Sequence, residues 1–432
     1  MAPQLLSPAD AATLLHPHDT LGIPLGPGQP SAFLHALGDR DDWVELTVFG
    51  ALLVDLYAVF TKPGVRYLSG FFGPAERFLV DSGARVEFVP ADFRRFTRIA
   101  EQLSPRVVAT VATPPDADGF VSLSLHAGAT VDAIARAGAD PDRVLVVETN
   151  AKFPRTRGLL PEFGHRVHLD QIDVLVESDR DPFVLPEVVP GDVDRAIAAH
   201  VQPLIPDGAT LQTGIGGIPS TVVGLLAHGD GGDYGVHSEM FTTGLMQLHR
   251  AGKVSNLRKG QFDGVSITTF AAGTLELYAW LDENQDVAFL PVDVVNSPEV
   301  ISRNRSMLTI NGALTVDLNG QVVADTIGGR QFSGIGGHED FTAPSGLSLA
   351  DRSLICMPST SLVDGVCISR IVPALAEGWV VTTPRHQLDL VVTEHGVAHL
   401  RGRTVRERAR ALADIADLPF RDELRERAER LG

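Results

Sequence analysis

Cysteine is nearly absent from this chain, because Cys356 and Cys367 are its only cysteines among 432 residues. Two thiols provide neither a disulfide framework nor the ligands of a zinc site. We therefore interpret both as small side chains in or near a hydrophobic core, and we expect no bound metal ion. Lysine is also scarce, with four lysines among the 36 basic residues, which we attribute to genome composition rather than function.

Long hydrophobic runs are missing as well. The longest apolar stretch, FGALLVDLYAVF (49–60), is short and contains Asp55, so the sequence predicts no membrane-spanning helix. Residues 1–20 lack a basic segment followed by an apolar one, which is how a signal peptide begins. We expect a cytoplasmic protein with no membrane partner.

Positive charge is in deficit, because 54 acidic residues outnumber the basic ones and the net charge is −18. This balance argues against nucleic acid or an anionic membrane as the main partner. An anionic small molecule could still bind, but it would need donors placed locally. Hydrophobic residues at 44% and charged residues at 21% are typical of a globular protein.

The chain alternates short β-branched runs with helical patterns, which predicts an α/β fold with largely parallel sheets. A helix is predicted over 128–138. A charged, proline-rich stretch at 177–192 predicts a boundary between two open α/β domains, at 1–185 and 190–432, and we expect the active site in the cleft between them. The predicted strands are 106–112, 143–148, 172–177, 353–358, 379–383 and 388–394.

Glycine-rich loops occur at matching places in the two halves. GPGQPSAFLHAL (26–37) and GIGGIPSTVVGLL (214–226) both place glycines, a proline and a serine before an apolar helix, which suggests two copies of one strand–loop–helix unit. Such a loop brings backbone N–H groups and a helix N-terminus close to a ligand, although a structural tight turn explains it equally well. A further loop, GGRQFSGIGGHEDF (328–341), also suggests close backbone approach to a ligand.

A single carboxylate, Glu239, stands in DYGVHSEMFTTGLMQLH (233–249), where an apolar strand is expected to turn into a helix. Two interpretations are open from the residues alone. The carboxylate can cap the helix, favoured by free N–H groups and by the helix dipole. It can also be a nucleophile that forms a covalent intermediate.

Nearly the whole chain resembles the acetyl-CoA hydrolase/transferase family. PPDADGFVSLSL (114–125) and VVETNAKFPRTRG (146–158) are similar to the first half of its members. The second half has seven motifs in the family's order: GIGGIPS, GVHSEMFTTG, VNSPEVISRN, INGALTVDLNGQV, SGIGGHEDF, SRIVPAL and VVTEHGVAHLRGRTVRERA.

The resemblance implies a CoA-transferase in which Glu239 is the nucleophile. Its carboxylate attacks an acyl-CoA to form an acyl-glutamyl anhydride, and the CoA thiolate then attacks the glutamyl carbonyl to form a glutamyl-CoA thioester. A second carboxylic acid reverses these steps. The implied partners are acyl-CoA and small carboxylic acids, with CoA as a substrate and no tightly bound cofactor. A homodimer or a higher homo-oligomer is also implied.

Further site residues follow from the resemblance. Gly337 matches the glycine whose amide lines the oxyanion hole, and we expect its backbone geometry to be unsuited to a side chain. Asn296 matches an asparagine that orients the reacting carboxyl group, although it could simply cap the turn before Pro298. Glu394 matches a second active-site glutamate, although a surface carboxylate at a strand end would look the same.

Contacts with CoA are less clear from the sequence. The oxyanion hole or the CoA site is expected to include Gly216, Gly217, Ile218 and Gly336. Arg258 and Lys259 form the nearest basic pair after the nucleophile, and Lys259 is a candidate to bind the CoA phosphates. A solvated surface pair is the more ordinary interpretation.

Three departures from the family pattern affect substrate identity. They are His338 in place of a usual glutamine, Thr242–Thr243 in place of a usual Ser-Asp pair, and a long, glycine-rich segment at 228–234. Two other functions stay open on the same scaffold: an acyl-CoA hydrolase, which differs in admitting water to the intermediates, and a catalytically silent CoA-binding protein.

Overall fold

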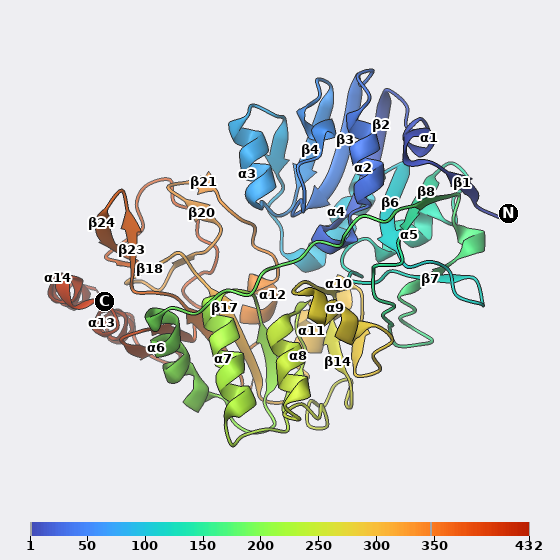
Figure 1. The fold of residues 1–432 in the computed structure, drawn as a ribbon. Coiled ribbons are helices and arrows are strands. Elements are labelled where there is room, and N and C mark those ends of the chain that lie inside the picture. The colour runs from blue at the N-terminus through green and yellow to red at the C-terminus, as the bar shows by residue number, and fades with distance from the viewer. Residues whose placement is uncertain (1, 346–347, 432) are drawn as a thin grey trace. The chain divides into compact units, whose positions relative to one another are not determined.

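The computed structural model describes residues 2–345 and 348–431. By their internal contacts these residues form two compact units, and each is described here by itself (Figure 1). The first unit comprises Met1–Pro186, Glu239–Phe241 and Ile267–Ser297, and the second comprises Glu187–Ser238, Thr242–Ser266 and Pro298–Gly432.

An eight-stranded sheet, parallel throughout, forms the centre of the first unit. Its strand order is β1-β10-β8-β6-β2-β3-β4-β5. The strands are β1 (Gln4–Leu6), β2 (His18–Leu25), β3 (Glu45–Ala51), β4 (Val65–Ser69), β5 (Val86–Phe88), β6 (Val107–Ala112), β8 (Val144–Thr149) and β10 (Val174–Glu177).

Helices cover both faces of this sheet (Figure 1). In β6, Val107 and Ala109 pack into one core cluster while Val108 and Ala112 pack into another, because successive side chains of a strand point to opposite faces. A strand buried on both faces reads as a continuous apolar run, which is why this segment was recognisable in the sequence. One face carries α1 (Pro8–Ala12), α2 (Ser31–Gly38) and α3 (Pro74–Asp81), and the other carries α4 (Phe96–Leu103) and α5 (Val131–Ala137).

Smaller elements complete the first unit. Strands β7 and β9 pair antiparallel, β13 and β15 pair parallel, and β14 pairs with β16. Their bounds are β7 (Phe120–Ser122), β9 (Arg166–His168), β13 (Met240–Phe241), β14 (Ser266–Thr268), β15 (Phe270–Ala271), β16 (Val287–Phe289), α9 (Leu275–Leu281) and α10 (Val292–Val295). Four 3-10 turns lie at Gly26–Gly28, Ala58–Thr61, Phe93–Arg95 and Leu169–Gln171.

The second unit is built on a six-stranded sheet of order β12-β11-β17-β22-β26-β27, in which only the β26–β27 pair is antiparallel. One face is covered by α6, α7 and α8, and the other by α13 and α14 with the strand β18. The bounds are β11 (Thr210–Thr213), β12 (Gly235–Val236), β17 (Met307–Gly312), β18 (Thr315–Asp317), β22 (Arg352–Cys356), β26 (Leu390–Thr393), β27 (Gly396–His399), α6 (Asp192–Val201), α7 (Gly217–His228), α8 (Thr243–Arg250), α13 (Val405–Asp414) and α14 (Leu418–Glu429).

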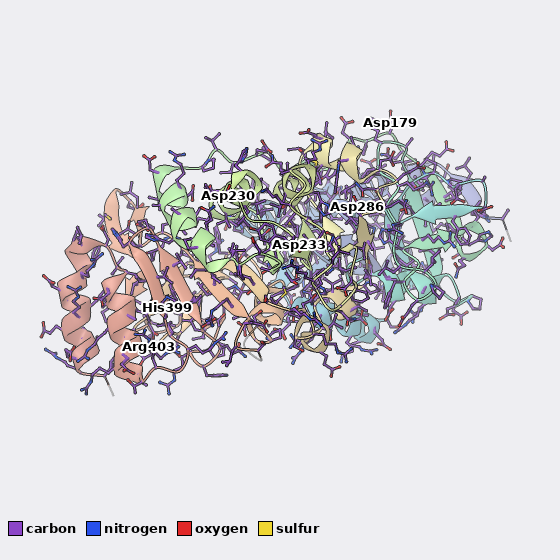
Figure 2. The ribbon with its side chains drawn as sticks, turned by 90° about the horizontal axis from the view of Figure 1, so that it is seen from below. Asp179, Asp230, Asp233, Asp286, His399 and Arg403 are labelled. Carbon is purple, nitrogen blue, oxygen red and sulfur yellow. The ribbon has the colours of Figure 1, made fainter. Side chains whose placement is uncertain are left out.

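Short pieces surround this second sheet. They are β19 (Val322–Val323), β20 (Thr326–Ile327), β21 (Arg330–Gln331), β23 (Thr360–Val363), β24 (Val366–Ser369), β25 (Ile371–Val372), α11 (Pro298–Ile301), α12 (His338–Thr342) and a 3-10 turn at Gln202–Leu204. No helix among the described residues is long and apolar enough to cross a membrane. Exposed aspartates, among them Asp179 and Asp286 of the first unit and Asp230 of the second, carry part of the negative charge (Figure 2).

The two units share a topology. The strand order β3-β2-β6-β8-β10 of the first corresponds to β12-β11-β17-β22-β26 of the second, with every pair parallel. The strand–loop–helix unit suggested by the two glycine-rich loops therefore occurs twice, as β2 to α2 and as β11 to α7.

The predicted α/β class with largely parallel sheets is confirmed. One predicted strand, WVVTT at 379–383, is wrong, because only Thr383 makes a bridge, with Val322, while Val380 and Val381 are 48% and 39% exposed. The contact boundary at Pro186 lies inside the predicted stretch 177–192.

The compact units differ from the predicted ranges 1–185 and 190–432 in two later segments, 239–241 and 267–297, which pack with the first unit. Backbone pairing explains this placement, because the Ala271 N–H donates to the Leu125 carbonyl and the Phe289 N–H donates to the Arg157 carbonyl, each at 2.8 Å.

Candidate active site

Glu239 lies at a bend between β12 and β13, and not at the start of a helix. Helix α8 begins four residues later, at Thr243, and its cap is Thr242, whose hydroxyl accepts from the Leu245 N–H at 3.4 Å. The interpretation of Glu239 as a helix cap is therefore wrong.

The backbone of Glu239 is held firmly in place. Its carbonyl accepts from the N–H groups of Thr269, at 3.0 Å, and Phe270, at 3.3 Å. The hydroxyl of Thr268 also donates toward this oxygen at 2.9 Å, and its one proton is shared with the Phe270 carbonyl at the same distance. No local pattern singles out Thr268 in the sequence, because the contact joins segments that are distant in the chain.

The side chain of Glu239 meets Asn296. The Nδ2 of Asn296 donates to Oε2 of Glu239 at 2.6 Å. Asn296 is fully buried and stands at the C-terminal cap of α10, with φ −93° and ψ 7°. Asn296 ends a helix just before Pro298, as expected of a residue that caps a turn. Its side chain also contacts Glu239, as expected of a residue that orients the reacting carboxyl group. A donor so close to an ionised oxygen makes a strong, charge-assisted hydrogen bond.

The glycines at the start of α7 have structural reasons of their own. Gly216, the N-cap, has φ +119°, a conformation that other residues rarely adopt. A Cβ at Gly217 would lie 2.5 Å from the carboxylate of Asp194 on α6. Ile218 is buried in the core of the second unit. A contact of these residues with CoA or an oxyanion stays a prediction.

The glycine-rich loop at 328–341 differs from the expected backbone conformation at Gly337. Gly337 has φ −90° and ψ 10°, a region that residues with side chains also occupy, so its backbone is not unsuited to a side chain. The neighbouring Gly336, at φ +55°, is the residue in the left-handed region. Gly337 caps α12 in the second unit, and its role as an oxyanion donor stays a prediction.

His338, the residue in place of the usual glutamine, points into the protein. It is 9% exposed and its Nε2 lies 2.8 Å from the hydroxyl of Thr383. That hydroxyl donates to Oε1 of Glu339 at 2.6 Å, so its single proton is used and the Nε2–H of His338 must be the donor to Thr383. Burial lowers the pKa of His338 to about 4, which keeps the ring neutral near pH 7.

Glu394 directly follows β26, and its side chain is 16% exposed, so it is not a fully exposed surface carboxylate. The N–H of Ser359 donates to Oε2 at 2.9 Å, and the Ser359 hydroxyl donates to Oε1 at 2.6 Å. Ser359 was not identified from the sequence. Its position just after β22, the strand beside β26, was the available signal, because parallel strands end at one edge.

Lys259 is not on the surface. It is fully buried in the second unit, and its Nζ donates to the Val265 carbonyl at 2.7 Å. Burial lowers the pKa of this amine to about 7. The expected solvated surface pair is therefore wrong for Lys259, and a buried Nζ has no surface to offer to CoA phosphates in this conformation.

This burial predicts how stability depends on pH. Since the folded pKa is about 7 and the reference value is 10.5, the unfolded chain binds more protons between these values, so stability should rise with pH across this window. The contribution is on the order of 5 kcal/mol, at about 1.4 kcal/mol per pKa unit. Lys259→Met, of similar volume, should remove this slope in urea unfolding measured from pH 7 to 10.

The matched control for this prediction is Lys152→Met, because Lys152 is 46% exposed and pairs with Asp181 at the surface. It should keep the slope of the wild-type protein. A free-energy difference between wild type and Lys259→Met that does not change with pH would contradict the prediction.

The structure brings Glu239 and Asn296 together in the first unit. The other predicted residues, Gly216 to Ile218, Gly336, Gly337 and Glu394, belong to the second unit. There the loop after β11 and the segment after β26 leave the carboxyl edge of one parallel sheet, the edge at which α/β proteins bind ligands.

The two cysteines lie in different environments. Cys356 is buried in β22, where burial raises the pKa of its thiol to about 12. Cys367 is exposed, so its interpretation as a core residue is wrong. Across residues 2–345 and 348–431, no group of three or more His, Cys, Asp or Glu side chains could hold a metal ion.

Comparison with known proteins adds independent findings. The model of the acetyl-CoA hydrolase/transferase C-terminal domain matches residues 273–428. The chain is 36% identical to succinyl-CoA:cyclohexane-1-carboxylate CoA transferase from Geobacter metallireducens, over 99% of this chain and 96% of that protein. It is 38% identical to 4-hydroxybutyrate coenzyme A transferase from Clostridium kluyveri, over 91% and 92%.

Solved structures show the same likeness. RipA from Yersinia pestis superposes with a TM-score of 0.89 at 30% identity, covering 99% of this chain and 97% of that one. The likeness to an acetyl-CoA hydrolase from Neurospora crassa is weaker, at 27% identity over 74% of this chain and 64% of that protein.

Proposed function

Because this chain belongs to the acetyl-CoA hydrolase/transferase family and is an acyl-CoA:carboxylate CoA-transferase, we propose that it moves CoA between short-chain carboxylic acids through covalent intermediates on Glu239. CoA is a substrate in this reaction, which needs no tightly bound cofactor. We also propose a cytoplasmic location, and a homodimer or higher homo-oligomer, the latter on the family resemblance.

The reaction begins when a carboxylate oxygen of Glu239 attacks the thioester carbonyl carbon. The C–S bond breaks, the CoA thiolate leaves, and an acyl-glutamyl anhydride remains. The thiolate then attacks the glutamyl carbonyl, the anhydride C–O bond breaks, and the first carboxylate departs from a glutamyl-CoA thioester. A second carboxylate repeats the two steps in reverse and leaves as the new acyl-CoA. No proton is gained or lost overall.

The contact between Glu239 and Asn296 carries this proposal. The amide of Asn296 holds one carboxylate oxygen at 2.6 Å, while three donors hold the backbone carbonyl of Glu239. A nucleophile fixed at both ends starts near its reacting geometry, which lowers the entropic part of the barrier. Splitting a difficult exchange into two acyl transfers lowers the barrier further.

Each step passes through a tetrahedral oxyanion, which needs preorganised donors. A backbone N–H placed for this purpose contributes about 3–4 kcal/mol to the transition state. We propose Gly337 and the loop at 216–218 as the donors, with Glu394 as the second active-site carboxylate.

The test is to trap CoA on Glu239. Acyl-CoA supplied without an acceptor should convert Glu239 into a glutamyl thioester, which is electrophilic and is reduced to an alcohol by borohydride. Peptide mass mapping should then find the change at Glu239, together with loss of activity. Glu239→Gln should show no labelling.

Two controls make the trap decisive. Labelling must require acyl-CoA, and Glu45→Gln, which alters an exposed carboxylate of the same unit, should label as the wild-type protein does. A modification at Glu394 or at a cysteine would refute the nucleophile assignment. Rapid hydrolysis of acyl-CoA with little adduct at steady state would identify an acyl-CoA hydrolase, and neither turnover nor adduct would identify a silent CoA-binding protein.

A further inference from the structure

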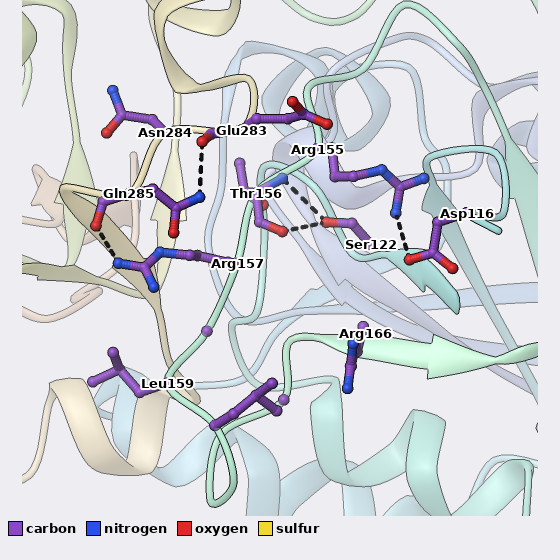
Figure 3. Close-up of a pocket in the computed structure, with 13 residues that line it drawn as sticks. Asp116, Ser122, Arg155, Thr156, Arg157, Leu159, Arg166, Glu283, Asn284 and Gln285 are labelled. Atoms are coloured by element: carbon purple, nitrogen blue, oxygen red, sulfur yellow. Dashed lines mark hydrogen bonds and ion pairs between the residues drawn. The ribbon is translucent and has the colours of Figure 1, made fainter. Parts of the chain in front are cut away.

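A cavity of about 610 Å³ opens in the first unit, and neither Glu239 nor Asn296 is among its lining residues (Figure 3). Its walls come from the whole segment 155–160, from β7 and β9, and from the 283–285 turn that leads to β16. This volume lies within the range of about 300–1,000 Å³ that is typical of small-molecule sites.

Three guanidinium groups line the cavity, and the first of them is neutralised locally. Arg155 pairs with Asp116 at 3.6 Å and also donates to the carbonyls of Pro114 and Phe120. The pKa of Asp116 is lowered, first by the Phe120 N–H and to a lesser extent by the charges of Arg155 and Arg166. Asp116 therefore forms an ion pair with Arg155 and offsets part of the charge of Arg166.

The other two guanidinium groups, of Arg157 and Arg166, have no carboxylate at ion-pair distance in the described part of the chain. Arg157 donates through Nη2 to the Gln285 carbonyl, while its buried Nε has no hydrogen-bond partner there. The guanidinium of Arg166 stacks on the ring of Phe120, 3.9 Å from the centroid, which leaves its N–H edge for other acceptors.

One further carboxylate lines the cavity, that of Glu283, and it is exposed. In the view of Figure 3 it points away from Arg157 and Arg166. Three arginines against two carboxylates leave the lining of the cavity with a net positive charge, in a chain whose net charge is −18. Two guanidinium groups without a carboxylate at ion-pair distance, in one cavity, suit a ligand with more than one anionic group.

We propose that this cavity binds a phosphorylated nucleotide, with Arg157 and Arg166 holding its phosphates. The volume exceeds what a short-chain carboxylic acid fills, and Leu159 and Leu160 supply apolar wall for a base. Two sources share this chemistry: the nucleotide half of CoA, which carries a 3′-phosphate, and a free adenine nucleotide. The proposal does not depend on covalent chemistry at Glu239.

The experiment measures binding of adenosine 3′,5′-bisphosphate and of ADP by isothermal titration calorimetry. The Arg157→Gln/Arg166→Gln protein should bind either ligand on the order of 100-fold more weakly than wild type, roughly tenfold for each lost charge-assisted contact. Arg85→Gln is the matched control, because Arg85 is a 64% exposed arginine of the same unit. It should bind as the wild-type protein does.

The single variant Arg166→Gln guards against misfolding, because among the described residues the Arg166 side chain stacks on the Phe120 ring and acts on Asp116 through its charge alone. It should keep the wild-type melting temperature and bind roughly tenfold more weakly. Tighter binding of the bisphosphate than of ADP would identify CoA as the source, and equal binding would identify a free nucleotide.

Three outcomes would overturn the proposal. The first is that neither nucleotide binds at millimolar concentration. The second is that the double variant binds the nucleotides as tightly as Arg85→Gln does. The third is that succinate binds as tightly as the nucleotides, with the same dependence on the two arginines. The last result would identify a dicarboxylate site. Trapping of CoA on Glu239 is a separate measurement. A nucleotide-binding experiment that contradicts this proposal therefore leaves the proposed function of Glu239 untouched.

Discussion

Replacing Glu239 with glutamine should lower the turnover number for CoA transfer by at least about 10⁴-fold, because an amide cannot form the anhydride. The fold should persist, since the three donors to the residue 239 carbonyl are unaffected and the glutamine Oε1 can still accept from Asn296. Steady-state kinetics and thermal melting, measured on one preparation, check both halves of this expectation.

Two further variants calibrate this loss. Glu239→Asp keeps the charge but withdraws the carboxylate from Asn296 by one methylene, and a displacement of about 1 Å can cost about 100-fold. Glu45→Gln should leave turnover unchanged, because the Glu45 side chain is 75% exposed. If Glu239→Gln retains more than about one hundredth of the wild-type activity, Glu239 is not the nucleophile.

Removing the Asn296 amide should have the next largest effect. Asn296→Ala should lower the turnover number by about 10²–10³-fold, in the range found when one preorganised donor is deleted. The KM for acyl-CoA should change less than the turnover number, because Asn296 acts on the carboxylate of Glu239 rather than on bulk substrate binding.

Asn296→Asp separates positioning from packing, because it keeps the size of the side chain. Two carboxylates at this distance cannot both be ionised easily, so the acid limb of the pH–rate profile should move to higher pH. Asn304→Ala is the matched control: Asn304 is 3% exposed, and its Nδ2 donates only to backbone carbonyls among the described residues. An equal loss of turnover in that control would mean that Asn296 acts through stability alone.

The α/β class could be predicted because local residue patterns indicate buried strands and amphipathic helices. Strands β6, β8, β10, β22 and β26 all lie within one or two residues of their predicted positions. The failure at 379–383 has a tertiary cause: the run of β-branched residues lies in a loop whose Val380 and Val381 are exposed, and it meets β19 only at its end, where Thr382 and Thr383 contact Val322. Strand propensity depends on packing partners more than on the backbone.

Candidate site residues were predicted as separate motifs, and their neighbours were not. Glu239 and Asn296 each stand in a recognisable segment, whereas the 2.6 Å bond between them joins residues far apart in the chain. Ser359, which holds Glu394, escaped notice because nothing local distinguishes a serine that binds a carboxylate from one that faces water. Glycine is ambiguous in the same way: a Cβ at Gly217 would lie 2.5 Å from the carboxylate of Asp194, whether or not a ligand approaches the loop.

The sequence by itself determined the class of fold, the family, and the identity of the candidate nucleophile, because these depend on residue order and on short-range periodicity. Only the tertiary structure decided that Lys259 is buried, that Gly336 rather than Gly337 has the left-handed backbone, and that 239–241 and 267–297 pack with the first unit. The physical reason is that burial, backbone conformation and pairing arise from contacts between distant segments. Identical local sequences can meet different partners in the folded chain.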